Sequence, residues 1–220
     1  MHLSSTLPHT PRMAARASAR PPLAHALESG VLEAGVDEAG RGCLAGPVVA
    51  AAVVFPPERR EYPTGICDSK LLSAEERQEA RQWVQQEALA WGLGVASVDQ
   101  IGRENILQAC FTAMHEALDQ LCAVATPAKL LVDGNRFRPY GALPHSCQVK
   151  GDQRFVAIAA ASILAKTYRD ELMAELHQRA PQYGWRQNKG YPTPAHRHAI
   201  ALWGPSPWHR PGFKLLKSSD

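Results

Sequence analysis

Short apolar runs alternate along this chain with longer stretches in which apolar residues recur at three- and four-residue steps. The first pattern predicts β-strands and the second predicts amphipathic helices. Strands are expected over residues 31–36, 47–55, 91–98, 129–133 and 146–150. Helices are expected over residues 73–90, 103–124, 155–180 and 195–203. This order of elements predicts an α/β fold, in which a mixed five-stranded sheet is flanked by helices.

Two local signals strengthen the helix assignments. Ser73 is followed three residues later by Glu76, a capping box that predicts a helix start. The helix over 155–180 is rich in small side chains, which would let it lie close against a sheet. These small residues are Ala157, Ala159, Ala160, Ala161, Ser162 and Ala165.

The composition is that of an ordinary soluble protein. The chain has 220 residues, of which 45% are apolar and 20% charged, so one main domain is the default expectation. The longest apolar run, Pro47–Phe55, is far shorter than the ~20 residues of a membrane span. Five scattered cysteines without a Cys-x-x-Cys pair favour neither a disulfide framework nor a zinc site. We therefore expect reduced thiols and a cytoplasmic location.

Composition also changes along the chain. Residues 1–30 carry three arginines and one acid without a sustained period, and we expect a disordered extension there. A tail without function is the favoured interpretation, although the segment also resembles a transit peptide or a lead before a second start at Met13. Residues 31–180 form the expected catalytic domain, and 181–220 a C-terminal substrate-binding segment packed on it. From Tyr183 onward, six Lys or Arg accompany one acid, with aromatic residues between them. This segment is typical of a nucleic-acid surface, although the net charge of +3 alone is too mild to show one.

Four carboxylates stand at the ends of predicted strands. Asp37 and Glu38 are adjacent, and Asp133 and Asp152 each follow a later strand. A single Asp before Gly is most often a turn residue, but four acids gathered at one edge of a sheet would repel one another unless a cation neutralised them. Hard oxygen ligands favour Mg²⁺ or Mn²⁺, and two such ions about 4 Å apart are suited to phosphodiester cleavage. The glycine-rich turn after Glu38 lacks the Lys-Ser/Thr of a P-loop.

Several motifs together resemble the ribonuclease HII family, in the same order, from about residue 31 to about residue 213. They are Val36-Asp-Glu-Ala-Gly-Arg-Gly42, Asp68-Ser-Lys70, Val132-Asp-Gly-Asn135, Lys150-Gly-Asp152, Ala160-Ala-Ser-Ile-Leu-Ala-Lys166 with Arg169-Asp170, and Lys189-Gly-Tyr-Pro-Thr193. The resemblance implies the ribonuclease H-like fold. It also implies an endonuclease that cuts the RNA strand of RNA/DNA hybrids and the 5′ side of ribonucleotides embedded in duplex DNA.

The resemblance implies products with 3′-hydroxyl and 5′-phosphate ends, and cellular roles in ribonucleotide removal from DNA and in primer removal. It makes Asp37, Glu38, Asp133 and Asp152 the catalytic, metal-binding carboxylates, holding two Mg²⁺ or Mn²⁺ ions. Asp170 lies behind these ligands or, with equal weight, forms a helix-surface salt bridge to a neighbour such as Arg169.

Recognition of the ribose is also implied by the resemblance. The turn Gly40-Arg41-Gly42 contacts the 2′-hydroxyl, and the ring of Tyr191 stacks on the next deoxyribose. Ser69 and Lys70 are expected at a phosphate. Pro211-Gly212 replaces a serine-containing pattern common near the C-terminus of the family, which places fine substrate contacts in question.

Two alternatives stay open. One is another nuclease of the ribonuclease H-like superfold, such as a junction resolvase or an exonuclease, since this fold hosts several activities. The other is a hybrid-binding protein without catalysis, which the presence of all four acids disfavours. We expect a monomer that binds nucleic acid and no membrane. The sequence leaves open the preferred metal, the preference for one ribonucleotide or a long RNA stretch, the role of residues 1–30, and protein partners.

Overall fold

The computed structural model describes residues 22–216 apart from 60, 64, 67, 68, 70 and 71. Its strands are β1 (Glu33–Ala39), β2 (Val48–Val54), β3 (Ala90–Ala96), β4 (Lys129–Asp133) and β5 (His145–Gln148). Its α-helices are α1 (Ala74–Glu87), α2 (Val98–Glu104), α3 (Ile106–Cys122), α4 (Val156–Arg179), α5 (Trp185–Asn188) and α6 (Pro194–Trp203). Short 3₁₀ helices η2 (Gly151–Gln153) and η3 (Pro181–Tyr183) flank α4.

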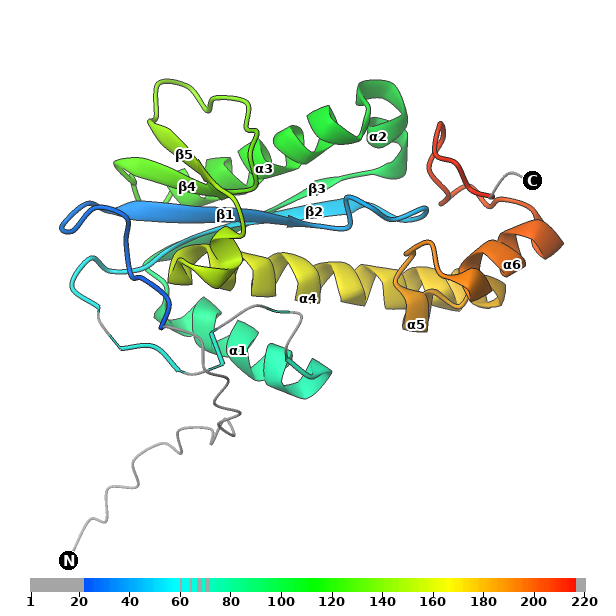
Figure 1. Ribbon diagram of the computed structural model, residues 1–220, viewed down its shortest axis with the longest axis horizontal. Coiled ribbons are helices and arrows are strands. Elements are labelled where there is room, and N and C mark those ends of the chain that lie inside the picture. Colours follow the sequence, from blue (N-terminus) through cyan, green and yellow to red (C-terminus); the bar gives the residue numbers. More distant parts are fainter. Residues whose placement is uncertain (1–21, 60, 64, 67–68, 70–71, 217–220) are drawn as a thin grey trace, which may run out of the picture.

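The strands form one mixed sheet, which confirms the predicted fold class. The strand order is β3-β2-β1-β4-β5. Strand β1 is central, antiparallel to β2 and parallel to β4, and β5 extends the parallel half. Helix α3 covers one face of the sheet, whereas α4, with α1 beside it, covers the other (Figure 1).

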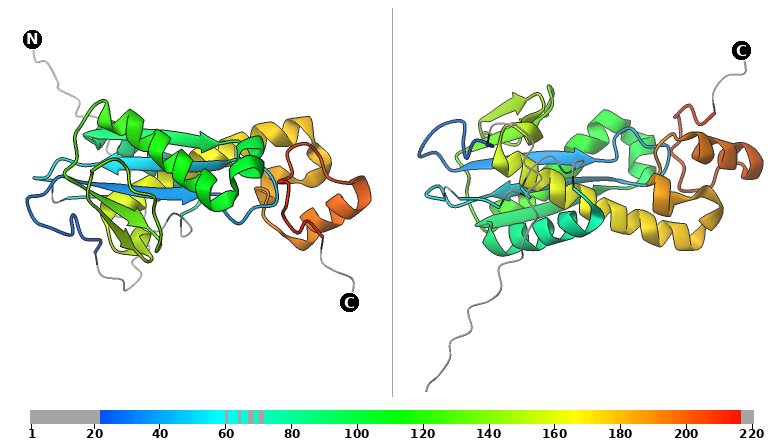
Figure 2. Two further views of the ribbon diagram at one scale, coloured as in Figure 1. Left: turned by 90° about the horizontal axis from the view of Figure 1, so that it is seen from above. Right: turned by 60° about the horizontal axis from the view of Figure 1, so that its bottom comes forward.

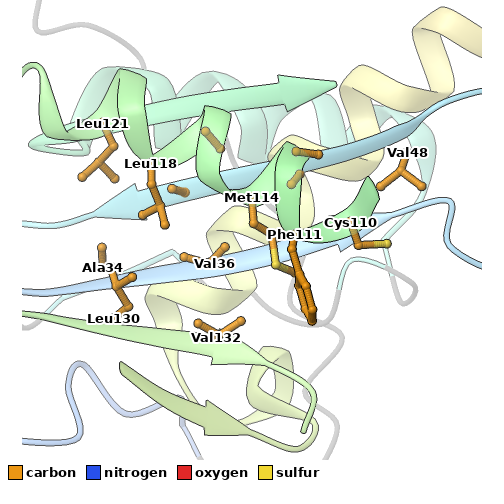
Figure 3. Close-up of a cluster of buried hydrophobic side chains, with 14 of the residues drawn as sticks. Ala34, Val36, Val48, Cys110, Phe111, Met114, Leu118, Leu121, Leu130 and Val132 are labelled. Carbon is orange, nitrogen blue, oxygen red and sulfur yellow. The ribbon is translucent and has the colours of Figure 1, made fainter. Parts of the chain in front are cut away.

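Alternate residues of the strands supply the two cores. Figure 3 shows the side chains of α3, among them Met114 and Leu118, above Val36 of β1 and Val132 of β4. On the opposite face, α4 packs on the other residues of β2, such as Val49 and Val53. Strand β2 is buried on both faces, which explains why its sequence reads as a continuous apolar run.

Glycine lets both helices approach the sheet closely. A Cβ built on Gly35 of β1 would lie 2.2 Å from the carbonyl carbon of Ala157 in α4. A Cβ on Gly94 of β3 would lie 1.9 Å from the carbonyl oxygen of Ala113 in α3. The small residues of α4 therefore act as predicted, with glycine in the strand as their counterpart.

Helix boundaries agree with the sequence, with one exception. Ser73 and Glu76 form the predicted capping box at the start of α1. The pattern expected to give one helix over 103–124 instead gives α2 and α3, which meet at Asn105. Asn105 has a φ of +69°, and its side-chain oxygen accepts hydrogen bonds from the backbone N–H groups of Leu107 and Gln108. Asparagine is both a good cap and tolerant of positive φ, so it ends one helix and starts the next.

Residues 22–30, the described part of the expected extension, pack against the rest of the protein. The backbone N–H of Ala24 donates to the carbonyl of Arg154, and the N–H of Val156 donates to the carbonyl of Ala24. Residues 22–30 thus pack beside the start of α4, and the expectation of disorder up to residue 30 is wrong for them. Residues 1–21 lie outside the described part of the chain.

The C-terminal segment lies beyond one end of the sheet, around the end of α4 (Figure 2). Its buried side chains, including Tyr183, Trp185 and Ile200, form a cluster with Met173 of α4 and Leu44 of the loop that follows β1. Two tight turns at Gly184 and Lys189, both with positive φ, frame the short helix α5, which the sequence pattern did not predict. No helix in the described residues has the length and apolar character needed to span a membrane.

Candidate active site

Two of the predicted acidic positions meet where β1 and β4 lie side by side. The parallel register pairs Val36 with Val132, which places Asp37 and Asp133 next to each other at the following position. Asp37 is 6% exposed. Glu38 follows on β1, and its backbone N–H donates to Oδ1 of Asp37 over 2.7 Å.

The three carboxylates repel one another electrostatically. Burial raises the pKa of Asp37 well above its ordinary value, and the charges of Glu38 and Asp133 raise it further. Burial also raises the pKa of Glu38, where Asp133 adds to the shift and Arg41 opposes it. The guanidinium of Arg41 is 3.6 Å from the Glu38 carboxylate. Such mutual repulsion is costly in a metal-free site and falls when a cation binds.

Asp152 reaches this region through the turn before α4. The backbone N–H of Gly151 donates to Oδ1 of Asp133 over 2.7 Å, which fixes η2 against the end of β4. Asp152 is the next residue and is buried. Lys150, just before the turn, has a φ of +55°, a conformation that side chains rarely adopt and that is often found near functional sites.

The donor chemistry fits Mg²⁺ or Mn²⁺, because all four candidate ligands supply carboxylate oxygens. As the side chains are placed, no group of three or more His, Cys, Asp or Glu residues within the described ranges is arranged to hold a metal ion. The structure brings the carboxylates of β1 and β4 close to the turn that carries Asp152. The described side chains are not arranged in the coordination geometry of a metal ion.

The turn Gly40-Arg41-Gly42 directly follows these acids. Gly40 has a φ of +93°, and a Cβ there would collide with the side chain of Arg169. Gly42 faces open space, because a Cβ added there would meet nothing within 4 Å apart from its chain neighbours. The side chain of Arg41 is half exposed. The backbone of the turn is thus open to solvent at Gly42, whereas Gly40 packs against the side chain of Arg169.

Two buried arginines, which the sequence reasoning did not assign to the site, hold this turn. Arg169 of α4 donates to the carbonyls of Ala45, Pro47 and Lys189. Arg210 donates to the carbonyls of Arg41, Gly46 and Pro47. They link the loop after β1 to the loop over 189–193.

One signal in the sequence marks Arg169. It stands four residues after Ala165 and four before Met173, on a helix face that is otherwise apolar and buried. A charged residue in such a stripe indicates a buried polar contact.

Ser69 and Lys70 are expected at a phosphate. Of these two, the structure describes Ser69, and Lys70 lies outside the described residues. The Ser69 hydroxyl is buried and lies 3.1 Å from the hydroxyl of Ser162. A hydrogen bond with Ser162 in turn lowers the pKa of Asp37. Ser69 is therefore connected to the acidic site through α4.

Asp170 forms one ion pair between α4 and α1 and another within α4. Its carboxylate is 3.6 Å from Nη1 of Arg77 and 3.5 Å from Nζ of Lys166. Arg77 also donates to the carbonyl of Ser69. Asp170 thus makes a salt bridge, as one of the two alternatives expected, but with Arg77 and Lys166 instead of Arg169.

Tyr191 presents its side chain to solvent at 42% exposure. The loop that carries it is held by backbone contacts: the N–H of Leu44 donates to the carbonyl of Gly190, and the N–H of Tyr191 to the carbonyl of Asn188. Gly190 has a φ of +81°, and a Cβ there would lie 2.5 Å from the carbonyl oxygen of Ala45. Tyr191 and the Gly40-Arg41-Gly42 turn consequently belong to one packed unit.

A mixed sheet whose central parallel strands end in adjacent carboxylates, with helices on both faces, is the arrangement of the ribonuclease H-like fold. The family model for ribonuclease HII matches residues 34–216. Ribonuclease HII of Parabacteroides distasonis is 52% identical over 190 residues, which cover 86% of this chain and 94% of that protein. The chain belongs to the ribonuclease HII family, whose members are endonucleases that hydrolyse RNA in RNA/DNA hybrids.

Solved structures agree with this assignment. The chain matches the structure of a PCNA:RNase HII complex from Archaeoglobus fulgidus with a TM-score of 0.70 and 25% identity, covering 86% of this chain and 98% of that one. Ribonuclease H2 from Pyrococcus horikoshii OT3 matches with a TM-score of 0.70 and 24% identity, covering 83% and 94%. At 24% identity, the similarity to the Pyrococcus horikoshii protein shows only that the two chains share a fold.

Proposed function

We propose that this ribonuclease HII cleaves the RNA strand with Asp37, Glu38, Asp133 and Asp152 acting as one metal-binding site. The observation that carries the proposal is the adjacency of Asp37 and Asp133 at the ends of two neighbouring parallel strands, with Glu38 next to Asp37. Asp133 comes from a part of the sequence distant from the other two, and the cost of burying the three carboxylates together is offset when dications bind.

Two bound Mg²⁺ or Mn²⁺ ions would supply an activated water and stabilise the leaving 3′-oxygen, giving 3′-hydroxyl and 5′-phosphate ends. The chain's own part is to position the ligands. Asp37 is held by the Glu38 N–H and Ser162, and Asp133 by the Gly151 N–H. These contacts hold two of the four proposed ligands in place before substrate arrives, which limits the reorganisation needed during the reaction.

Discrimination between RNA and DNA is assigned to the turn Gly40-Arg41-Gly42 and to Tyr191. Both are anchored by Arg169, and both present an outward surface: an open backbone at Gly42 and an exposed ring at Tyr191. Contact of the turn with the 2′-hydroxyl and stacking of the ring on the next deoxyribose would select a ribonucleotide followed by DNA. Ser69 and Lys70 are assigned to a phosphate.

The proposed cleavage preference also implies a cellular role. A monomeric, cytoplasmic enzyme with this preference would remove single ribonucleotides from DNA and RNA primers from replicating strands. Its expected partners are nucleic acids, namely RNA/DNA hybrids and DNA that contains a ribonucleotide.

The test is cleavage of a DNA duplex that contains one ribonucleotide, with an all-DNA duplex as control. We expect a cut on the 5′ side of the ribonucleotide in Mg²⁺ or Mn²⁺ and none in the control. Asp37→Asn should bind the duplex almost as well as the wild type and should not cleave it. Unchanged turnover by Asp37→Asn would overturn the assignment of the site.

A further inference from the structure

Two buried histidines stand behind the loop that carries Tyr191. His196 of α6 is 0% exposed and His209 is 5% exposed, and their Nε2 atoms are 3.1 Å apart. Nδ1 of His196 lies 2.9 Å from the carbonyl oxygen of Tyr191. The proposed active-site chemistry uses neither ring.

Fixed donors at both ends determine which nitrogen of each ring carries the proton. Trp185 Nε1–H can only donate, and it points at Nε2 of His196 over 2.9 Å. His196 must therefore accept at Nε2 and carry its proton on Nδ1. The backbone N–H of Ser206 donates to Nδ1 of His209 over 2.9 Å, so His209 carries its proton on Nε2.

These tautomers make a directed chain of hydrogen bonds. The Ser206 N–H donates to His209, His209 Nε2–H shares the lone pair of His196 Nε2 with Trp185 Nε1–H, and His196 Nδ1–H donates to the Tyr191 carbonyl. A proton added to either ring would place two donors face to face. Burial lowers the pKa of both histidines, which keeps both rings neutral and the chain intact.

We infer that His196, with His209 behind it, is a positioning residue that sets how Tyr191 meets the sugar on the 3′ side of the cut. The inference rests on the role proposed above for Tyr191. The Tyr191 carbonyl accepts from His196 Nδ1–H and from the N–H of Thr193, so loss of the imidazole removes a contact that fixes this loop from the side of α6. Without the imidazole, kcat/KM for a ribonucleotide followed by DNA should fall more than kcat/KM for a continuous RNA/DNA hybrid.

The readout is a preference ratio: kcat/KM for a duplex with one ribonucleotide followed by DNA, divided by kcat/KM for a continuous RNA/DNA hybrid. His196→Leu removes the donor at similar volume and should lower the ratio about tenfold, the scale of a small misplacement of a contact. His196→Asn keeps an N–H near the Nδ1 position and should keep the ratio within about threefold. Ile200→Ala is the matched control, because Ile200 is buried one turn later in the same helix and faces the same cluster.

Tyr191→Ala distinguishes a failure of the role proposed for Tyr191 from a failure of the role inferred for His196. If Tyr191→Ala leaves the ratio unchanged, the role proposed for Tyr191 fails, and the inference fails with it. If Tyr191→Ala lowers the ratio but His196→Leu does not, or if Ile200→Ala lowers it as much as His196→Leu, the inference alone is overturned.

The inference can also be tested on the wild-type protein, where the result does not depend on whether a variant folds. Long-range ¹H–¹⁵N NMR of the imidazoles at pH 7 should show neutral rings, with the proton on Nδ1 of His196 and on Nε2 of His209. The opposite tautomer in either ring, or a charged ring, would overturn the inference.

Discussion

A Cβ atom built on Gly40 would lie 1.9 Å from Nε of Arg169. The first glycine of the turn Gly40-Arg41-Gly42 is thus in direct contact with a buried guanidinium from α4, which also holds the loop of Tyr191 through the Lys189 carbonyl. Arg169 therefore links the loop after β1 to the loop over 189–193, together with the direct backbone contact of Leu44 with Gly190.

Gly40→Ala should damage both stability and activity. The new methyl group must displace Arg169, and alanine must adopt a φ of +93°. We expect a loss of about 2–4 kcal/mol in unfolding free energy, measured by urea denaturation, and a fall in cleavage rate of at least about tenfold. Gly42→Ala is the control for stability, since its Cβ meets open space and its φ is not in the left-handed range; it should stay within about 0.5 kcal/mol of the wild type. Equal losses in the two variants would contradict the role of Arg169 behind Gly40.

Arg169→Lys should also be strongly destabilising. A lysine ammonium cannot reproduce the planar fork that serves three carbonyls on two loops, so buried carbonyls lose their donors. We expect a loss of about 2–4 kcal/mol in unfolding free energy. Arg179→Lys, at an exposed position of the same helix, should change it by less than about 0.5 kcal/mol. A lysine tolerated at both positions would show that the guanidinium contacts contribute little.

Divalent metal should stabilise the folded protein through the carboxylates. Burial, and after it the neighbouring negative charges, raise the pKa values of Asp37 and Glu38, so their ionised forms are costly until a cation binds. At a metal concentration one hundred times the dissociation constant, the gain is about 2.7 kcal/mol. Thermal unfolding with Mn²⁺ and with EDTA should show this gain in the wild type and its loss in Asp133→Asn. A variant that gains as much as the wild type would place the metal elsewhere.

The protein should lose stability in mild acid. Burial lowers the pKa of His209 from its ordinary value of 6.5 to about 4 and lowers that of His196, which Arg197 also disfavours as a cation. The unfolded chain therefore takes up these protons first as the pH falls, and stability is lost between about pH 6.5 and pH 4, on the order of 2 kcal/mol. Urea denaturation at each pH should show this slope, and His209→Gln should flatten it. His198→Gln, at an exposed position, should not; if both flatten it equally, the buried pair is not its source.

The sequence was sufficient for the architecture because each element carries its own pattern. The capping box at Ser73 and the apolar run of β2 are local signals, and both elements formed where predicted. The break at Asn105 was missed because apolar periodicity continues through it, and only the φ of +69° reveals two helices. Residues 22–30 were missed for a different reason: their order comes from backbone hydrogen bonds to residues far along the chain, which composition does not encode.

Acidic positions at strand ends could be predicted because β-strand ends are recognisable and parallel neighbours align them. The supports of the site could not be, because Arg169, Arg210, His196 and His209 act on backbone carbonyls or on one another across the loops. The place of Arg169 in an apolar helix stripe indicates a buried polar contact, but a side chain that binds a distant carbonyl leaves no spacing rule that identifies its partner. For the same reason, the ion-pair partners of Asp170 became clear only once α1 was seen beside α4.

The central claim is that carboxylates from three places in the chain work as one hydrolytic site, and Asp152 tests it best because it comes from the turn outside the two strands. The measurement is single-turnover cleavage of a duplex with one ribonucleotide by Asp133→Asn and Asp152→Asn, with binding of the same duplex measured in parallel. We expect both variants to bind as the wild type does and to cleave at least about a thousandfold more slowly. Cleavage by Asp152→Asn at the wild-type rate would contradict the account.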